Sequence, residues 1–194
     1  MANAQATTRN AIELLEEDHR KVKHIFKQFE NAEQPARKKD LVTKAIEELT
    51  IHTQIEEELL YPQILKTGGE ELHELGEEAY EEHHVVKLLM SELKNMEPDD
   101  ERYDAKFTVL IENVEHHIDE EEEEMFPKIE KAGKIDLERL GHEMFERKME
   151  LRGQGDGISE MPEKVSSRAN KHNGAPKKRA PRGAKSKSKA RKRG

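Results

Sequence analysis

Apolar side chains recur every three or four residues along most of this 194-residue chain, in stretches that proline and glycine separate. This period predicts helices, and no stretch shows the alternation that is typical of a β-strand. Asn10 and Glu13 have the spacing of a capping box, so the first helix is predicted to begin there. The predicted helices cover about residues 10–30, 35–67 and 70–95, a stretch that follows the turn at 97–100, and residues 136–151.

Proline and glycine also mark where these helices are interrupted. An aromatic–proline pair at residues 61–62 disturbs the second helix, and two glycines at 68–69 stop it. A second such pair at residues 126–127, together with Gly133, ends the fourth helix. Helices with one apolar stripe bury that stripe against each other. The predicted fold class is therefore all-α: an antiparallel up-down-up-down four-helix bundle over residues 1–151 with a short fifth helix.

The remaining residues, 152–194, are predicted to form a disordered basic tail. They consist mainly of Lys, Arg, Ser, Ala, Pro and Gly and contain no aromatic residue, so they cannot bury enough apolar surface to offset the entropy of ordering. Residues 163–194 contain 13 Lys or Arg and one Glu, whereas the other 162 residues contain 21 basic and 41 acidic side chains. The net charge of −8 therefore combines an acidic body with a strongly basic tail.

Composition excludes several classes of protein. The chain has no cysteine, which excludes disulfides, thiol catalysis and cysteine-bound metal clusters. No apolar run approaches the roughly 18 residues that a membrane span requires, and the first ten residues lack the apolar core of a secretory signal. We therefore expect a cytoplasmic protein without a membrane partner.

An internal repeat carries the candidate chemistry. Two segments, beginning at His52 and His117, share a glutamate four residues later, an aromatic residue nine later and a proline ten later. The helix before each segment carries one more histidine, His19 or His83, with apolar residues 3, 6, 7 and 10 positions further on. His19 precedes His52 by 33 residues, and His83 precedes His117 by 34. A unit of one helix with His and one helix with HxxxE therefore occurs twice.

The repeat predicts a metal site in the bundle core. Residues four apart on a helix point the same way, and all six side chains lie on apolar stripes. A single histidine there is explained by a solvated or hydrogen-bonded position, but four imidazoles and two carboxylates in one core need neutralisation. We predict a pair of metal ions, each bound by two imidazoles and bridged by the glutamates. Nitrogen and oxygen donors suit iron, and manganese or zinc also fit. The predicted metal ligands are His19, His52, Glu56, His83, His117 and Glu121.

The order H…HxxxE…H…HxxxE over about residues 10–130 resembles the hemerythrin-like, or HHE cation-binding, proteins. The resemblance implies an antiparallel four-helix bundle with a non-haem di-iron centre held by the same six residues. Oxygen-carrying hemerythrins have a histidine where this chain has Ala79, four residues before His83, and they have HxxxxD where this chain has HxxxE at 117–121. The resemblance thus favours the subgroup linked to peroxide or nitric oxide chemistry, oxidative stress, and iron or oxygen sensing.

Two functions remain open at this point. The first is a di-iron protein that reacts with or senses a small oxidant (peroxide, O2 or NO), including catalase-like peroxide disproportionation; no further catalytic side chain is predicted. The second is a non-catalytic iron or oxygen sensor, or an iron store, tethered to nucleic acid by the tail. Tyr80, three residues before His83, is a candidate hydrogen-bond donor or phenolate ligand, or else a packed core residue. His84 and His116 are predicted to face outward.

The tail is predicted to bind DNA or RNA non-specifically, through counterion release and without base readout. Such binding would make the protein nucleoid-associated. The alternatives are that the tail folds onto its own acidic body or only aids solubility. The predicted polyanion-binding residues are Lys177, Lys178, Arg179, Arg182, Lys185, Lys187, Lys189, Arg191, Lys192 and Arg193.

Overall fold

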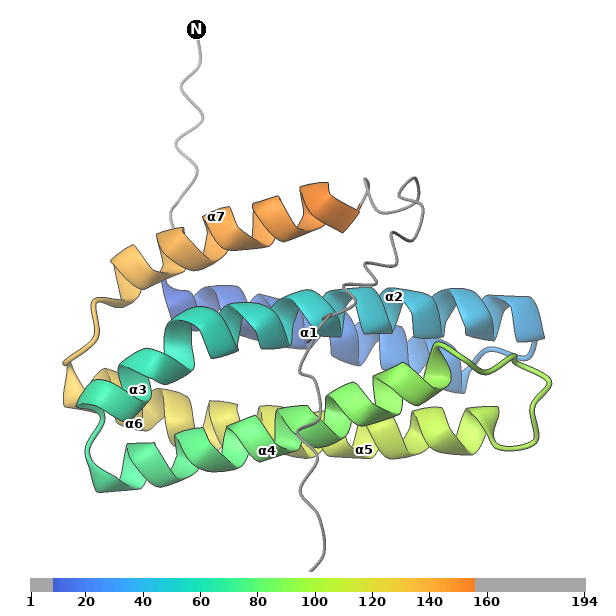
Figure 1. Ribbon diagram of the computed structural model, residues 1–194, viewed down its shortest axis with the longest axis horizontal. Coiled ribbons are helices and arrows are strands. Elements are labelled where there is room, and N and C mark those ends of the chain that lie inside the picture. Colours follow the sequence, from blue (N-terminus) through green and yellow to red (C-terminus); the bar gives the residue numbers. More distant parts are fainter. Residues whose placement is uncertain (1–8, 156–194) are drawn as a thin grey trace, which may run out of the picture. The chain divides into compact units, whose positions relative to one another are not determined.

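The structure is a computed structural model, and it describes residues 9–155. Within that range all regular structure is helical, with no strand (Figure 1). Residues 152–155, predicted as the start of the disordered tail, belong instead to the last helix. The rest of the predicted tail, with the ten predicted polyanion-binding residues between 177 and 193, lies outside the described residues. The elements are α1 (Ala11–Glu30), α2 (Pro35–Ile55), the π-helix η1 (Glu56–Leu60), α3 (Tyr61–Thr67), α4 (Glu70–Leu93), α5 (Tyr103–Glu120), the π-helix η2 (Glu121–Met125), α6 (Phe126–Ala132) and α7 (Leu137–Gly155).

Two helical hairpins build the bundle. Helix α1 packs along α2 and α4 packs along α5, while α1 also contacts α5 and α2 also contacts α4 (Figure 1). Successive long helices are thus neighbours that run in opposite directions, which confirms the up-down-up-down arrangement. Helix α7 lies across α1 and α2 as an additional layer on one side of the bundle.

Local sequence signals set most helix boundaries. The Asn10 side chain accepts a hydrogen bond from the Glu13 N–H (3.0 Å), and the Glu13 carboxylate accepts one from the Asn10 N–H (3.1 Å). The predicted capping box is therefore confirmed. Pro35 occupies the first turn of α2, where its missing N–H costs nothing. Helix α7 runs to Gly155, four residues beyond the predicted end at Leu151.

The helices pass through both aromatic–proline pairs instead of stopping there. In η1 the Tyr61 N–H donates to the Glu56 carbonyl, and in η2 the Phe126 N–H donates to the Glu121 carbonyl, five residues back in each case. A proline in an α-helix clashes with the carbonyl four residues earlier, and the wider π turn relieves that clash. Helical structure therefore continues through residues 126–127, which were predicted to help end the fourth helix, and it stops at Gly133, whose φ is +60°, as predicted for that glycine.

The core consists of two apolar clusters with a polar belt between them. One cluster lies toward the end of the bundle that contains Phe26 and Phe107. The other contains Leu15 and Ile64 and extends to the apolar face of α7. Along each long helix, the predicted ligand histidine lies next to residues of these clusters. The four histidines therefore meet at the same height along the bundle axis.

None of the helices within residues 9–155 combines the length and the apolar composition that crossing a bilayer requires.

Candidate metal centre

The structure brings the six predicted ligands together in the bundle core. Each of the four long helices contributes one histidine, and the two glutamates are the first residues of η1 and η2. Every one of the six side chains is at least 94% buried. The exposed fractions are 1% for His19, 6% for His52, 0% for Glu56, 1% for His83, 4% for His117 and 1% for Glu121.

The donor atoms form two groups that share a carboxylate. The first group contains His19, His52, Glu56 and Glu121, and the second contains Glu56, His83 and His117; within each group the donor atoms lie within 4.8 Å of one another. In the first group, His52 Nε2 is 3.1 Å from Glu56 Oε2 and His19 Nε2 is 3.3 Å from Glu121 Oε2. Each imidazole therefore turns its Nε2 toward a carboxylate in the centre.

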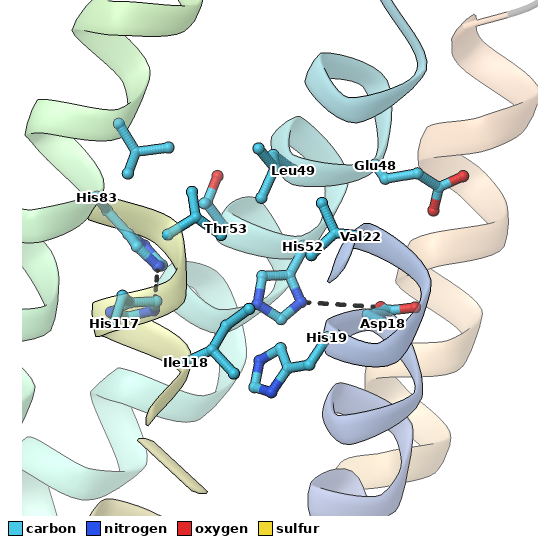
Figure 2. A pocket seen from close by; sticks show the side chains of 12 residues that line it. Asp18, His19, Val22, Glu48, Leu49, His52, Thr53, His83, His117 and Ile118 are labelled. Atoms are coloured by element: carbon cyan, nitrogen blue, oxygen red, sulfur yellow. Dashed lines mark hydrogen bonds and ion pairs between the residues drawn. The ribbon is translucent and has the colours of Figure 1, made fainter. Parts of the chain in front are cut away.

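The two glutamates also reach the second group. His83 Nε2 is 3.5 Å from Glu56 Oε2, and His117 Nε2 is 3.6 Å from Glu121 Oε2. The Nε2 atoms of His83 and His117 are 3.0 Å apart, and Figure 2 shows this contact as a dashed line between the two rings. Because Glu56 and Glu121 each face imidazoles of both groups, either carboxylate could bridge two cations.

Charge and hydrogen bonding show that the site fits a cation. Buried atoms without a hydrogen-bond partner within residues 9–155 include His19 Nε2, His52 Nε2, both carboxylate oxygens of Glu56, and Glu121 Oε2. Such atoms are costly unless a ligand satisfies them. Burial raises the pKa of Glu56 well above its usual range, and the nearby Glu121 carboxylate raises it further. Burial alone would also raise the pKa of Glu121, but His117 and His19 outweigh it and lower that pKa.

The surroundings thus favour the protonated form of Glu56 and the ionised form of Glu121. A divalent cation at the same place would stabilise both glutamates in the ionised form. The structure supplies the donor types, the burial and the negative charge that such a cation requires.

A second set of carboxylates orients the imidazoles. Three histidines have a carboxylate oxygen 2.7–3.0 Å from Nδ1, and the fourth has one at 3.8 Å. A carboxylate at Nδ1 favours a proton there and leaves Nε2 as the metal-binding atom. The pairs are Glu122 with His19, Asp18 with His52, Glu57 with His83, and Glu82 with His117.

Sequence reasoning missed these four carboxylates, although the repeat contains them. An acidic residue immediately precedes His19 and His83, and another immediately follows Glu56 and Glu121. Each acidic residue binds a histidine of a different helix, so the pairing depends on the bundle and not on local spacing. Extending the repeat by one residue on each side would have found the set.

The aromatic residue at the centre is Tyr61, which sequence reasoning treated only as part of a helix interruption. Tyr61 is fully buried, and its hydroxyl donates to Glu121 Oε1 (3.1 Å). The Tyr61 hydroxyl oxygen is also 3.2 Å from His83 Nε2. Because the π turn places residue 61 over residue 56, the phenol returns to the face that carries Glu56. The Tyr80 hydroxyl instead donates to the Glu57 backbone carbonyl (3.2 Å), outside the group of six.

A small cavity adjoins the four histidines. Its volume is about 10 Å³, and apolar side chains from all four long helices line it together with the imidazoles. These apolar residues are Val22, Leu49, Val86, Val114 and Ile118. Figure 2 shows several of them beside the His52 ring. A cavity of this volume has room for about one molecule the size of water. His84 and His116, in contrast, are exposed, which confirms their predicted outward orientation.

The chain matches one protein family model. The family model "Hemerythrin HHE cation binding domain" matches residues 10–129. An uncharacterised hemerythrin-like protein of Schizosaccharomyces pombe is 30% identical over 114 residues, which are 59% of this chain and 56% of that protein. A protein of Nostoc sp. named DNA nickase is 27% identical over 122 residues, which are 62% of this chain and 33% of that protein.

A solved structure has a similar fold. The crystal structure of a hemerythrin HHE cation-binding domain-containing protein from Mycobacterium kansasii is similar to this chain with a TM-score of 0.65 and 29% sequence identity. The similarity covers 77% of this chain and 91% of the mycobacterial chain. The all-helical bundle is thus the fold of this family.

Proposed function

Since the chain belongs to the hemerythrin HHE cation-binding family, we propose that its six buried His and Glu side chains hold two non-haem iron ions that react with a small oxidant. The observation that carries the proposal is the division of the donor atoms into two groups that share Glu56. The small oxidants we propose are peroxide, dioxygen and nitric oxide. The match spans 56% of the Schizosaccharomyces pombe protein and 33% of the Nostoc protein.

The donor set favours iron. Imidazole nitrogens and carboxylate oxygens, without sulfur, suit iron, and manganese or zinc would accept the same donors. A bound iron pair would supply redox chemistry, which the protein side chains lack. The four outer carboxylates would hold each imidazole in the tautomer that leaves Nε2 free.

The residues around the donors limit what reaches them. The cavity of about 10 Å³ has room for one molecule about the size of water, and apolar side chains line it beside the imidazoles. Tyr61 keeps a phenolic proton at Glu121 Oε1, within reach of the same centre. The site therefore combines metal-binding donor atoms, a phenolic hydroxyl that can donate a proton, and a small cavity beside them. The proposed reaction with a small oxidant would use all three.

The proposal is tested by metal content in a matched pair of variants. His83→Ala removes a buried donor, whereas His84→Ala removes its exposed neighbour. Full-length protein expressed with iron should contain about two iron ions per chain, as should His84→Ala, and His83→Ala should contain about one or fewer. Wild-type protein without metal, or equal metal content in the two variants, would contradict the proposal.

Assays of peroxide turnover then distinguish an enzyme from a sensor or store. Rapid oxygen evolution from hydrogen peroxide by the iron-loaded protein supports an enzyme. A fall in melting temperature on chelation, without oxygen evolution, supports a sensor or store whose stability follows metal occupancy.

The basic tail supports a second role, which we also propose: non-specific binding to DNA or RNA and a cytoplasmic location beside nucleic acid. It rests on the 13 basic residues within 163–194, which lie outside the described structure. One relative carries the name DNA nickase, which describes that protein as acting on DNA.

A further inference from the structure

Helix α7 contributes a buried amine close to the candidate metal centre. Lys148 is 9% exposed, and its Nζ bonds Asp18 Oδ1 of helix α1. Lysine is rarely buried unless it has a partner of opposite charge. Helix α7 lies beyond residues 10–129, so the stretch that carries the family's match does not include this cation.

Asp18 faces Lys148 with one oxygen and a candidate metal ligand with the other. Asp18 Oδ2 lies 3.8 Å from His52 Nδ1, and Figure 2 shows the carboxylate between the His52 ring and the helix at the right of the view. The corresponding carboxylates at the other three imidazoles are 2.7–3.0 Å away. His52 is therefore the ligand whose orienting carboxylate is held from outside the four-helix bundle.

The burial of both groups makes this contact important. Asp18 and Lys148 are each buried, so each depends on the other as its partner of opposite charge. Asp18 also lines a surface groove between α1 and α7. Without the ammonium, the carboxylate would lose its buried partner and could turn to the water in that groove, away from His52 Nδ1.

We propose that Lys148 is a positioning residue of the metal centre: by holding Asp18 against His52 it keeps the Nδ1–H tautomer and leaves His52 Nε2 free for a metal ion. The proposal rests on the proposed function in that His52 is a metal ligand. It makes α7 part of the centre, because docking of this helix and metal binding at His52 then stabilise each other.

The first test uses the metal-free full-length chain, so its result does not depend on metal binding. Long-range proton–nitrogen NMR spectra of the imidazoles report which ring nitrogen carries the proton. We expect the Nδ1–H tautomer of His52 in wild type and in Lys148→Arg, which keeps the cation, and a mixture of tautomers in Lys148→Met. Arg147→Met is the matched control. Arg147 is the neighbouring cation of α7, but it bonds the exposed Glu58 and not a carboxylate that faces an imidazole.

The second test is anaerobic titration of the same variants with Fe²⁺. Lys148→Met should bind one of two ions about ten-fold or more weakly, while the ion at His83 and His117 binds as in wild type. Lys148→Arg and Arg147→Met should match wild type. If Lys148→Met does not fold, the double variant Asp18→Asn/Lys148→Met, which removes both charges, takes its place with the same expected results.

Two outcomes would overturn the inference: a wild-type His52 tautomer in the variant that lacks Lys148, or Fe²⁺ affinity that is unchanged or higher. If wild type itself binds no Fe²⁺, the proposed function fails, and the tautomer spectra still decide whether Lys148 positions His52.

Discussion

At the scale of single residues, the two halves of the centre differ in one aromatic side chain. Tyr61 and Phe126 occupy the same place in the repeat, each directly after a π-helix. The Phe126 ring stacks on His19, with ring centres 5.9 Å apart and planes at 6°, whereas Tyr61 presents its hydroxyl to His83 and Glu121. The imidazole pair at His83 therefore has a proton donor beside it, and the pair at His19 has an apolar ring.

This difference predicts the effect of Tyr61→Phe. The substitution leaves Glu121 Oε1 without its donor in a fully buried place, so the metal-free chain should lose about 1–3 kcal/mol of unfolding free energy. The absorption spectrum of the iron-loaded protein should change as well. The matched control is Tyr80→Phe, whose hydroxyl bonds only a backbone carbonyl of a half-buried segment. Urea unfolding and absorption spectra measure both effects; equal results for the two variants would mean that the Tyr61 hydroxyl is not part of the centre.

The six inner residues could be predicted from the sequence because helical spacing and duplication both constrain them. His52 and Glu56 share a face within one helix, and the same unit recurs at His117. The outer carboxylates and Tyr61 could not be predicted in this way. Glu57 meets His83 across the bundle, and Tyr61 reaches the centre only because a π turn rotates it there. Contacts between helices and departures from the α-helical period are invisible to a periodicity argument.

At the scale of elements, both π-helices begin at a candidate ligand. Glu56 opens η1 and Glu121 opens η2, and each element is followed by a helix with proline in its first turn. The proline disfavours a regular α turn, so the widened π turn forms at the position where the carboxylate points into the core. A proline that sequence reasoning took as a disturbance is thus part of how the centre is built.

Helix α7 depends on a close approach at Gly141. A Cβ there would lie 2.4 Å from the Arg9 carbonyl oxygen and 2.7 Å from the Ala11 nitrogen, and both are backbone atoms that cannot move aside cheaply. The sequence predicted this helix but not where it packs, because Gly141 lies within an otherwise ordinary helical pattern.

We therefore expect Gly141→Ala to destabilise the chain by about 1–3 kcal/mol and to loosen α7. Gly153→Ala, in the same helix, meets nothing within 4 Å and should stabilise it by up to about 1 kcal/mol. Chemical denaturation measures both changes, and hydrogen exchange of α7 amides shows whether the helix has loosened. Similar small effects at both positions would mean that α7 does not pack against the start of α1 as described.

At the scale of the whole molecule, charge divides the chain into two parts with different expected partners. Residues 163–194 carry 13 basic side chains and one acidic one, while the rest of the chain has 41 acidic and 21 basic side chains. Phosphate repels the acidic part and attracts the basic one. The bundle could be predicted from the spacing of apolar residues and from the internal repeat, because both are visible within short stretches of sequence. The binding role proposed for the tail rests on its charge, so a binding experiment has to test it.

Removal of residues 163–194 should therefore abolish binding to duplex DNA and leave metal content and melting temperature almost unchanged. With about eight phosphate contacts, the affinity of the full-length chain should fall by about three orders of magnitude or more between roughly 50 and 200 mM salt. Fluorescence anisotropy of a labelled duplex measures the binding. A full-length variant with the ten basic residues of 177–193 changed to glutamine is the matched control for chain length, and it should behave like the truncated protein. If the truncated chain binds DNA as well as the full chain does, the tail is not the contact. If neither binds at low salt, the partner of the tail is not DNA, and an interaction with the acidic bundle is the explanation that its charge supports.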